Sequence, residues 1–154
     1  MRNLILLLAL AGTVFGIGCG GSNQDAGSAS PVEQQEAAWA KMMEVHDAVM
    51  PKMADMNRVS RELKVLAEGL EDKTQLELIN NAVENLEAAS EGMMVWMAEL
   101  QQPKKLREEK SHEEIMNYLN AETEEITQVQ EDMLSSLEQG QTLLKELQAE
   151  TAAE

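Results

Sequence analysis

Capping boxes, in which Ser or Thr is followed at the third position by Glu, mark where helices begin in this sequence. Three of them precede long runs of helix-forming residues: Ser30 with Glu33, Thr74 with Glu77, and Ser111 with Glu114. Aromatic residues make up only 3% of the chain, while Ala, Leu, Glu, Gln, Lys and Met dominate these runs, so strand signals are lacking. The pattern predicts an all-α fold with three helices.

Proline, glycine and the capping residues set the expected bounds: a first helix from Pro31 to about Gly69, a second from about Thr74 to just before Pro103, a charged connection over 102–110, and a third helix from Ser111 to about Ala149. Apolar residues recur at heptad spacing in each helix, and the connections are short. We therefore expect one domain, residues 31–150, that folds as an antiparallel, coiled-coil-like three-helix bundle. A coiled-coil dimer of longer helices is the alternative.

Pro51 lies inside the first helix, within the Met-rich stretch KMMEVHDAVMPKMADM. Proline has no backbone N–H, and its ring opposes the carbonyl of Asp47, four residues earlier. We expect the first helix to be kinked at Pro51 and to continue beyond it.

Antiparallel pairing gathers the methionines at one end of the bundle. A fold-back near residue 71 places His46 level with Trp96, and a second fold-back near residue 106 places Met97 level with Met116. Met94 is expected in the same cluster. The candidate metal ligands are its nine other members: Met42, Met43, His46, Met50, Met53, Met93, Trp96, Met97 and Met116.

Thioether and imidazole groups are the ligands that Cu(I) prefers, and thioethers remain usable in an oxidising compartment where a thiol would be lost. The face of Trp96 suits a cation. The cluster therefore predicts a site for Cu(I) or another soft metal. The alternative is a structural or protein-interaction module in which the methionines form an adaptable core or binding surface without metal.

Other chemical signals are weak. His46 and Asp47 are neighbours in sequence, so we expect them to point to different sides of the helix and not to form an oriented pair. Glu109 and His112 supply one Glu-x-x-His motif, fewer than a di-iron bundle needs. Glu122 interrupts an apolar stripe and is expected to set helix register. The sequence has no nucleophile paired with a base and no cofactor fingerprint, so we expect a non-enzyme.

The N-terminus has a basic start and an apolar run too short to span a bilayer, and small residues precede Cys19, the only cysteine. This resembles a bacterial lipoprotein signal, which implies removal of residues 1–18 and lipidation of Cys19. Residues 19–30 would then form the lipidated cysteine and a flexible tether. We expect a lipid-anchored domain in the bacterial cell envelope, at the outer membrane. A plain secretory signal is the alternative.

The formal net charge of −16 disfavours binding to nucleic-acid phosphates. The expected partners are the membrane, through the lipid, and a metal ion or an envelope protein. The oligomeric state stays open.

Three segments, MxxHDAVMPKM, MMVWM and YLNAE, together resemble a group of small lipoproteins of Bacteroidota, many of which carry the label "viral A-type inclusion protein". The matching residues are His46, Asp47, Met50, Pro51, Lys52, Met53, Met93, Met94, Trp96, Met97, Tyr118, Leu119 and Glu122. The resemblance covers most of the mature domain. It implies lipidation and a helical domain, and it implies no activity.

Overall fold

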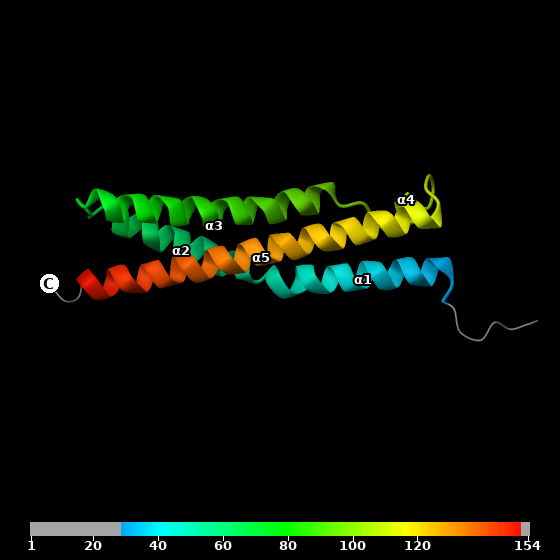
Figure 1. Cartoon of the computed structure of the whole chain (residues 1–154), viewed down its shortest axis with the longest axis horizontal. Helices are drawn as coiled ribbons and strands as arrows, with labels where there is room; N and C mark the ends of the chain where they lie inside the picture. The colour runs from blue at the N-terminus through cyan, green and yellow to red at the C-terminus, as the bar shows by residue number, and fades with distance from the viewer. Residues whose placement is uncertain (1–28, 152–154) are drawn as a thin grey trace, which may run out of the picture.

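The computed structural model describes residues 29–151, and within them the chain forms helices and no strands (Figure 1). The elements are α1 (Pro31–Val49), α2 (Lys52–Ala67), α3 (Lys73–Glu99), α4 (Pro103–Leu106) and α5 (His112–Thr151). The predicted all-α class is confirmed. The predicted signal peptide (1–18), Cys19 and nearly all of the tether lie outside the described residues.

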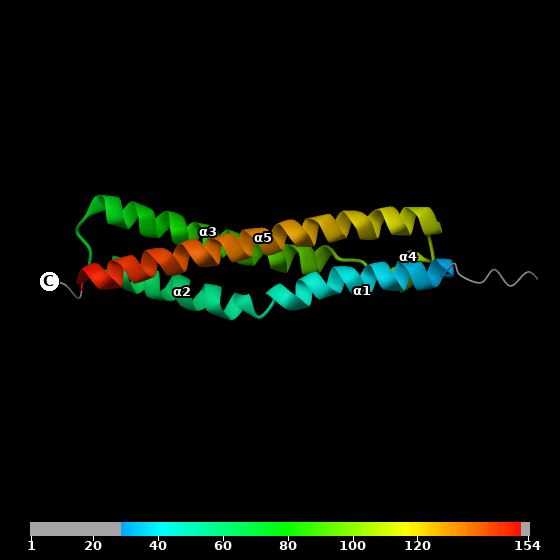
Figure 2. The same cartoon turned by 60° about the horizontal axis from the view of Figure 1, so that its bottom comes forward.

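The predicted first helix is present as α1 and α2, which are separated by a bend at Met50 and Pro51 (Figure 2). Met50 has φ −50° and ψ −40°, and Pro51 has φ −61° and ψ −22°. Both residues keep right-handed helical angles, so the chain changes direction without leaving the helical region. The kink predicted at Pro51 is confirmed.

The long α5 runs the length of the molecule and packs on α1, α2 and α3 (Figure 1). α3 returns antiparallel to α2 and packs on both α2 and α5. The bend at Pro51 carries the first segment across the bundle, so that α1 lies mainly on α5 while α2 lies against both partners. The result is the predicted antiparallel three-helix bundle.

Two predicted capping boxes are present: Ser30 with Glu33, and Ser111 with Glu114. The box predicted at Thr74 is wrong. Asp72 caps α3 instead, because its carboxylate accepts hydrogen bonds from the backbone N–H groups of Thr74 and Gln75, at 2.7 Å and 3.2 Å. One anionic oxygen thus satisfies two N-terminal donors, and the helix begins at Lys73.

Gly140 of α5 lies close to side chains of both α2 and α3. A Cβ atom at this position would lie 3.0 Å from Leu86 of α3 and 3.0 Å from Val59 of α2. The absence of a side chain therefore lets α5 lie deep between its neighbours. The main core extends in both directions from this point and includes buried Met42, Met56, Met93 and Met133 as well as aliphatic residues.

A second, small core lies at the end of the bundle that holds α4. Leu106, Ile115 and Leu119 are at most 3% exposed and form this cluster, and Trp39 packs against it. The charged connection predicted over residues 102–110 is present, but it contains the short helix α4, which the sequence did not predict. Leu106 and Pro103 are apolar residues within the charged run, and α4 turns both of them inward.

Candidate functional site

Three side chains from two helices meet near the bend. His46 lies in the last turn of α1, and Trp96 and Met97 lie near the end of α3. The ring centroids of His46 and Trp96 are 5.7 Å apart, with planes tilted by 31°. The Nε2 atom of His46 is 3.3 Å from the Sδ atom of Met97. The register that placed His46 level with Trp96 is therefore confirmed.

Asp47 contacts the other ring nitrogen of His46, with 2.8 Å between Nδ1 and Oδ1. The expectation that these neighbours do not pair is wrong. A short carboxylate one position along the helix can reach a ring that lies along the helix surface, even though the two Cβ atoms point in different directions. A carboxylate only accepts hydrogen bonds, so the pair fixes a proton on Nδ1.

Because the proton is held on Nδ1, the protonation state of the ring decides whether Nε2 presents a lone pair or an N–H to the sulfur of Met97. In the neutral ring, Nε2 then carries a lone pair that is directed at the thioether sulfur. In the protonated ring, Nε2 donates a hydrogen bond to that sulfur. The side chain of His46 is 13% exposed and that of Asp47 is 73% exposed, so the site opens to solvent on the Asp47 side.

The predicted methionine ligands differ in how deeply they are buried. Met42 and Met93 are completely buried in the main core, and four others are partly buried against it: Met43, Met50, Met53 and Met97. Met116 is partly buried but belongs to neither core cluster. Met94 is 53% exposed, so its expected place in the cluster is wrong. It follows Met93 directly, and one step along a helix turns a side chain by about 100°.

Trp96 also faces a carboxyl group. Its Nε1 atom is buried and has no hydrogen-bond partner at bonding geometry among the described residues. Glu122 of α5 lies on this side of the indole. Burial raises the pKa of Glu122, and the nearby carboxylates of Glu125 and Glu99 raise it further, while the Tyr118 hydroxyl and the indole N–H oppose the rise. Glu122 is therefore a half-buried acid beside the site as well as an interruption of the stripe.

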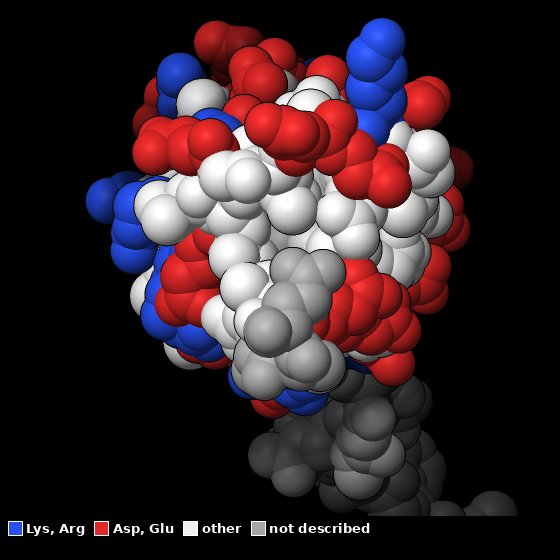
Figure 3. Space-filling view, turned by 90° about the vertical axis from the view of Figure 1, so that its left-hand side faces the viewer, with Lys and Arg blue, Asp and Glu red and all other residues white. Residues whose placement is uncertain are grey.

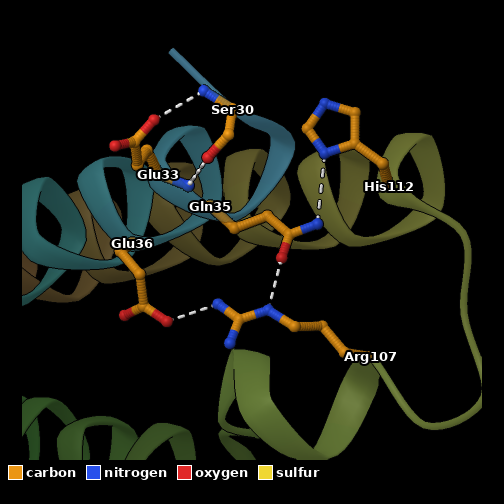
Figure 4. Close-up of polar contacts among 6 residues, drawn as sticks. All are labelled: Ser30, Glu33, Gln35, Glu36, Arg107 and His112. Atoms are coloured by element: carbon orange, nitrogen blue, oxygen red, sulfur yellow. Dashed lines mark hydrogen bonds and ion pairs between the residues drawn. The ribbon is translucent and has the colours of Figure 1, made fainter.

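The sequence also did not predict a group of polar side-chain contacts at the start of α1 (Figure 4). Gln35 is 3% exposed and contacts Arg107 and His112, and Arg107 is paired with Glu36. One signal was available, because Gln35 precedes Trp39 by four residues and so continues the apolar stripe of α1. Nothing in the sequence indicated that Arg107 would turn toward it.

The surface is acidic. Figure 3 looks at the end of the bundle that holds the α2–α3 connection, where Asp and Glu side chains border an uncharged area above and to the right, and Lys and Arg side chains lie at its left edge. A shallow groove of about 280 Å³ lies elsewhere, between α3 and α5, and is lined largely by small residues such as Ala88, Ala89 and Gly92. Across residues 29–151, no three His, Cys, Asp or Glu side chains are grouped to hold a metal. A centre of hard ligands is thus not found in this part of the chain.

No helix in the described region combines the length and apolar character needed to cross a membrane. No protein-family model, no curated protein and no solved structure matches the chain.

Proposed function

We propose that this domain binds Cu(I) between the imidazole of His46 and the thioether of Met97. The observation that carries the proposal is the 3.3 Å separation of Nε2 and Sδ, with Nδ1 of the same ring held by Asp47. A histidine that binds a metal commonly donates its other N–H to a carboxylate, which directs the free lone pair. Imidazole and thioether together suit Cu(I).

The spacing of the two donor atoms supports this assignment. With bonds of about 2.0 Å to nitrogen and about 2.3 Å to sulfur, which are the lengths zinc makes with nitrogen and thiolate sulfur, a tetrahedral angle separates the two donors by about 3.5 Å. The observed separation is 3.3 Å. An ion of this size therefore requires only a small movement of the two side chains.

Neighbouring groups complete the proposed site. Met43 of α1 and Met50, the C-cap of α1, lie within about one helical turn of His46, and both are partly buried, so they are the nearest partly buried thioethers in sequence. The ring centroid of Trp96 lies 5.7 Å from that of His46, so the indole would border the cation. Glu122 and the net negative charge of the chain favour the approach of a positive ion.

The rest of the proposal follows from the sequence. Lipid on Cys19 would hold the domain at the outer membrane of a bacterial envelope, and the tether would let it move near that surface. The domain would act as a binding protein with no catalytic activity. A structural or protein-interaction role, with the methionines serving only as core, is the alternative.

The test is a competition between the full chain and a chromophoric Cu(I) chelator, under anaerobic conditions in mild detergent. Fluorescence of Trp96 is followed in a Trp39→Phe background, so that only the indole at the site reports. We expect the chain to withdraw one equivalent of Cu(I) and the emission to be quenched. His46→Ala and Met97→Leu should each weaken binding by at least about tenfold.

Met133→Leu is the matched control, because Met133 is a buried methionine that is not among the predicted ligands. This variant should bind as the wild type does. Failure of the wild type to compete for Cu(I), or equal binding by the His46→Ala and Met133→Leu variants, would favour the alternative without metal.

A further inference from the structure

The amide of Gln35 joins three segments at the α4 end of the bundle (Figure 4). Its Oε1 atom accepts a hydrogen bond from Nε of Arg107 at 2.6 Å, and its Nε2 atom lies 3.1 Å from Nδ1 of His112. Arg107 directly follows α4, and His112 is the first residue of α5. The buried amide therefore ties α1 to both.

The chemistry of these groups fixes the direction of each hydrogen bond. A guanidinium group only donates, so the oxygen of the Gln35 amide must face Arg107 and the NH₂ group must face His112. That NH₂ group also only donates, so Nδ1 of His112 must accept. Only a neutral ring, with its proton on Nε2, meets this requirement.

We infer that Gln35 is a pH-dependent latch, which holds α1 on α4 and α5 only while His112 is neutral. Protonation of His112 would set an N–H against the NH₂ group of the amide. Rotating the amide by half a turn would satisfy His112 but would set the NH₂ group against Arg107. Neither orientation satisfies both partners, and a buried donor without an acceptor is costly.

The surrounding charges do not restore the lost bond. From α1, Glu36 is already paired with Arg107. In the first turn of α5, Glu114 is held by the capping box with Ser111, and Glu113 is exposed. Each of these acidic groups is thus already paired or exposed, and none is placed to replace the hydrogen bond between Gln35 and a protonated His112.

The latch lies between the first residue that caps α1 and the small core at the α4 end of the bundle. Ser30, which caps α1, lies just over one turn before Gln35 and is the last residue of the predicted tether. Trp39 lies one turn after Gln35 and packs against the small core of Leu106, Ile115 and Leu119. Opening of the latch should therefore loosen the start of α1 and expose Trp39, and this inference is independent of the proposed metal site.

The test follows the accessibility of Trp39 to acrylamide in the full chain, in a Trp96→Phe background, between about pH 7.5 and about pH 5.5, the range in which histidine changes charge. We expect the quenching constant to rise as the pH falls. His112→Asn should abolish this rise, because the Asn side-chain oxygen can accept from Gln35 and does not titrate. His46→Gln, which removes the other histidine, should leave the rise in place.

Gln35→Glu is the decisive variant. A carboxylate accepts from both Arg107 and a protonated His112, so the latch of this variant should close as the pH falls and the sense of the change should reverse. The loss of one hydrogen bond corresponds to about a fivefold change in the opening equilibrium. An unchanged pH response in His112→Asn, or the wild-type sense in Gln35→Glu, would overturn the inference.

Discussion

The Nε2 atom of His46 lies 3.3 Å from the Sδ atom of Met97, and this contact joins α1 to α3 across 51 residues of sequence. It forms where the first helical segment bends, because the bend lets α1 lie on α5 while its last turn still reaches the end of α3. The arrangement places a nitrogen donor and a sulfur donor side by side at the edge of the core, with access to solvent through Asp47.

Asp47 should orient His46 without supporting the fold. Asp47→Asn removes the anionic acceptor of the Nδ1 proton, so we expect the Cu(I) affinity to fall by about tenfold, which is typical for loss of a carboxylate that orients a metal-binding histidine. The free energy of unfolding should change by less than about 0.5 kcal/mol, since the side chain is largely exposed. Chelator competition and urea unfolding measure the two quantities.

Glu44→Gln is the matched control for Asp47→Asn, because Glu44 is an exposed acid in the same turn of α1. It removes the same charge near the site but should leave the affinity almost unchanged. If both variants weakened binding equally, the effect of Asp47 would be one of net charge and not of ring orientation.

Glu122 should make stability depend on pH. Burial raises its pKa in the folded state, so the folded protein holds this proton more tightly than the unfolded chain does. Its contribution to stability is therefore lost as the pH rises through the interval between the unfolded and folded pKa values. Glu122→Gln should raise the midpoint of urea unfolding at about pH 7.5, and the gain should disappear at about pH 4, where the carboxyl is protonated.

Glu124→Gln provides the comparison for Glu122→Gln, because Glu124 is an exposed acid on the same helix, two residues further on, and is not among the groups that raise the pKa of Glu122. It should give a much smaller gain at neutral pH. An equal gain would mean that relief of net negative charge explains both variants, and that burial of Glu122 does not.

Two glycines should respond oppositely to alanine. At Gly92 a Cβ atom would meet no other atom within 4 Å, so Gly92→Ala should stabilise the protein by about 0.5–1 kcal/mol through helix propensity alone. At Gly140 a Cβ atom would lie 3.0 Å from Leu86 and Val59, so Gly140→Ala should cost about 1 kcal/mol net as the core is pushed apart. Thermal unfolding of both variants checks this, and a stabilised Gly140→Ala protein would show that the core yields easily.

The elements that were predicted correctly depend on local or periodic signals. The capping boxes at Ser30 and Ser111 and the kink at Pro51 follow from side-chain and backbone chemistry within a few residues. The meeting of His46 with Trp96 follows from counting along two antiparallel helices. Counting was sufficient for this last contact because each helix presents a single apolar stripe to its partners.

The features that the sequence did not predict depend on the conformations of individual side chains. The pairing of His46 with Asp47 depends on the rotamer of a side chain at the helix surface. The contact between Gln35 and Arg107 depends on α4, a single turn that no capping box announces. Register alone places residues at the same level of a bundle, but it does not decide which side chain turns inward.

Leu106 should be the residue that holds α4 in place. It is 3% exposed and forms the small core with Ile115 and Leu119, so Leu106→Ala should destabilise the protein by about 2 kcal/mol or more through lost burial and a cavity. Leu134→Ala is the matched control, because Leu134 is 44% exposed on α5 and should cost less than about 0.5 kcal/mol. Urea unfolding of the two variants measures the difference. If the two variants lost the same stability, the packing of Leu106 would add nothing to the stability of the bundle. We expect the larger loss in Leu106→Ala to be accompanied by greater acrylamide quenching of Trp39, because Trp39 packs against the same small core.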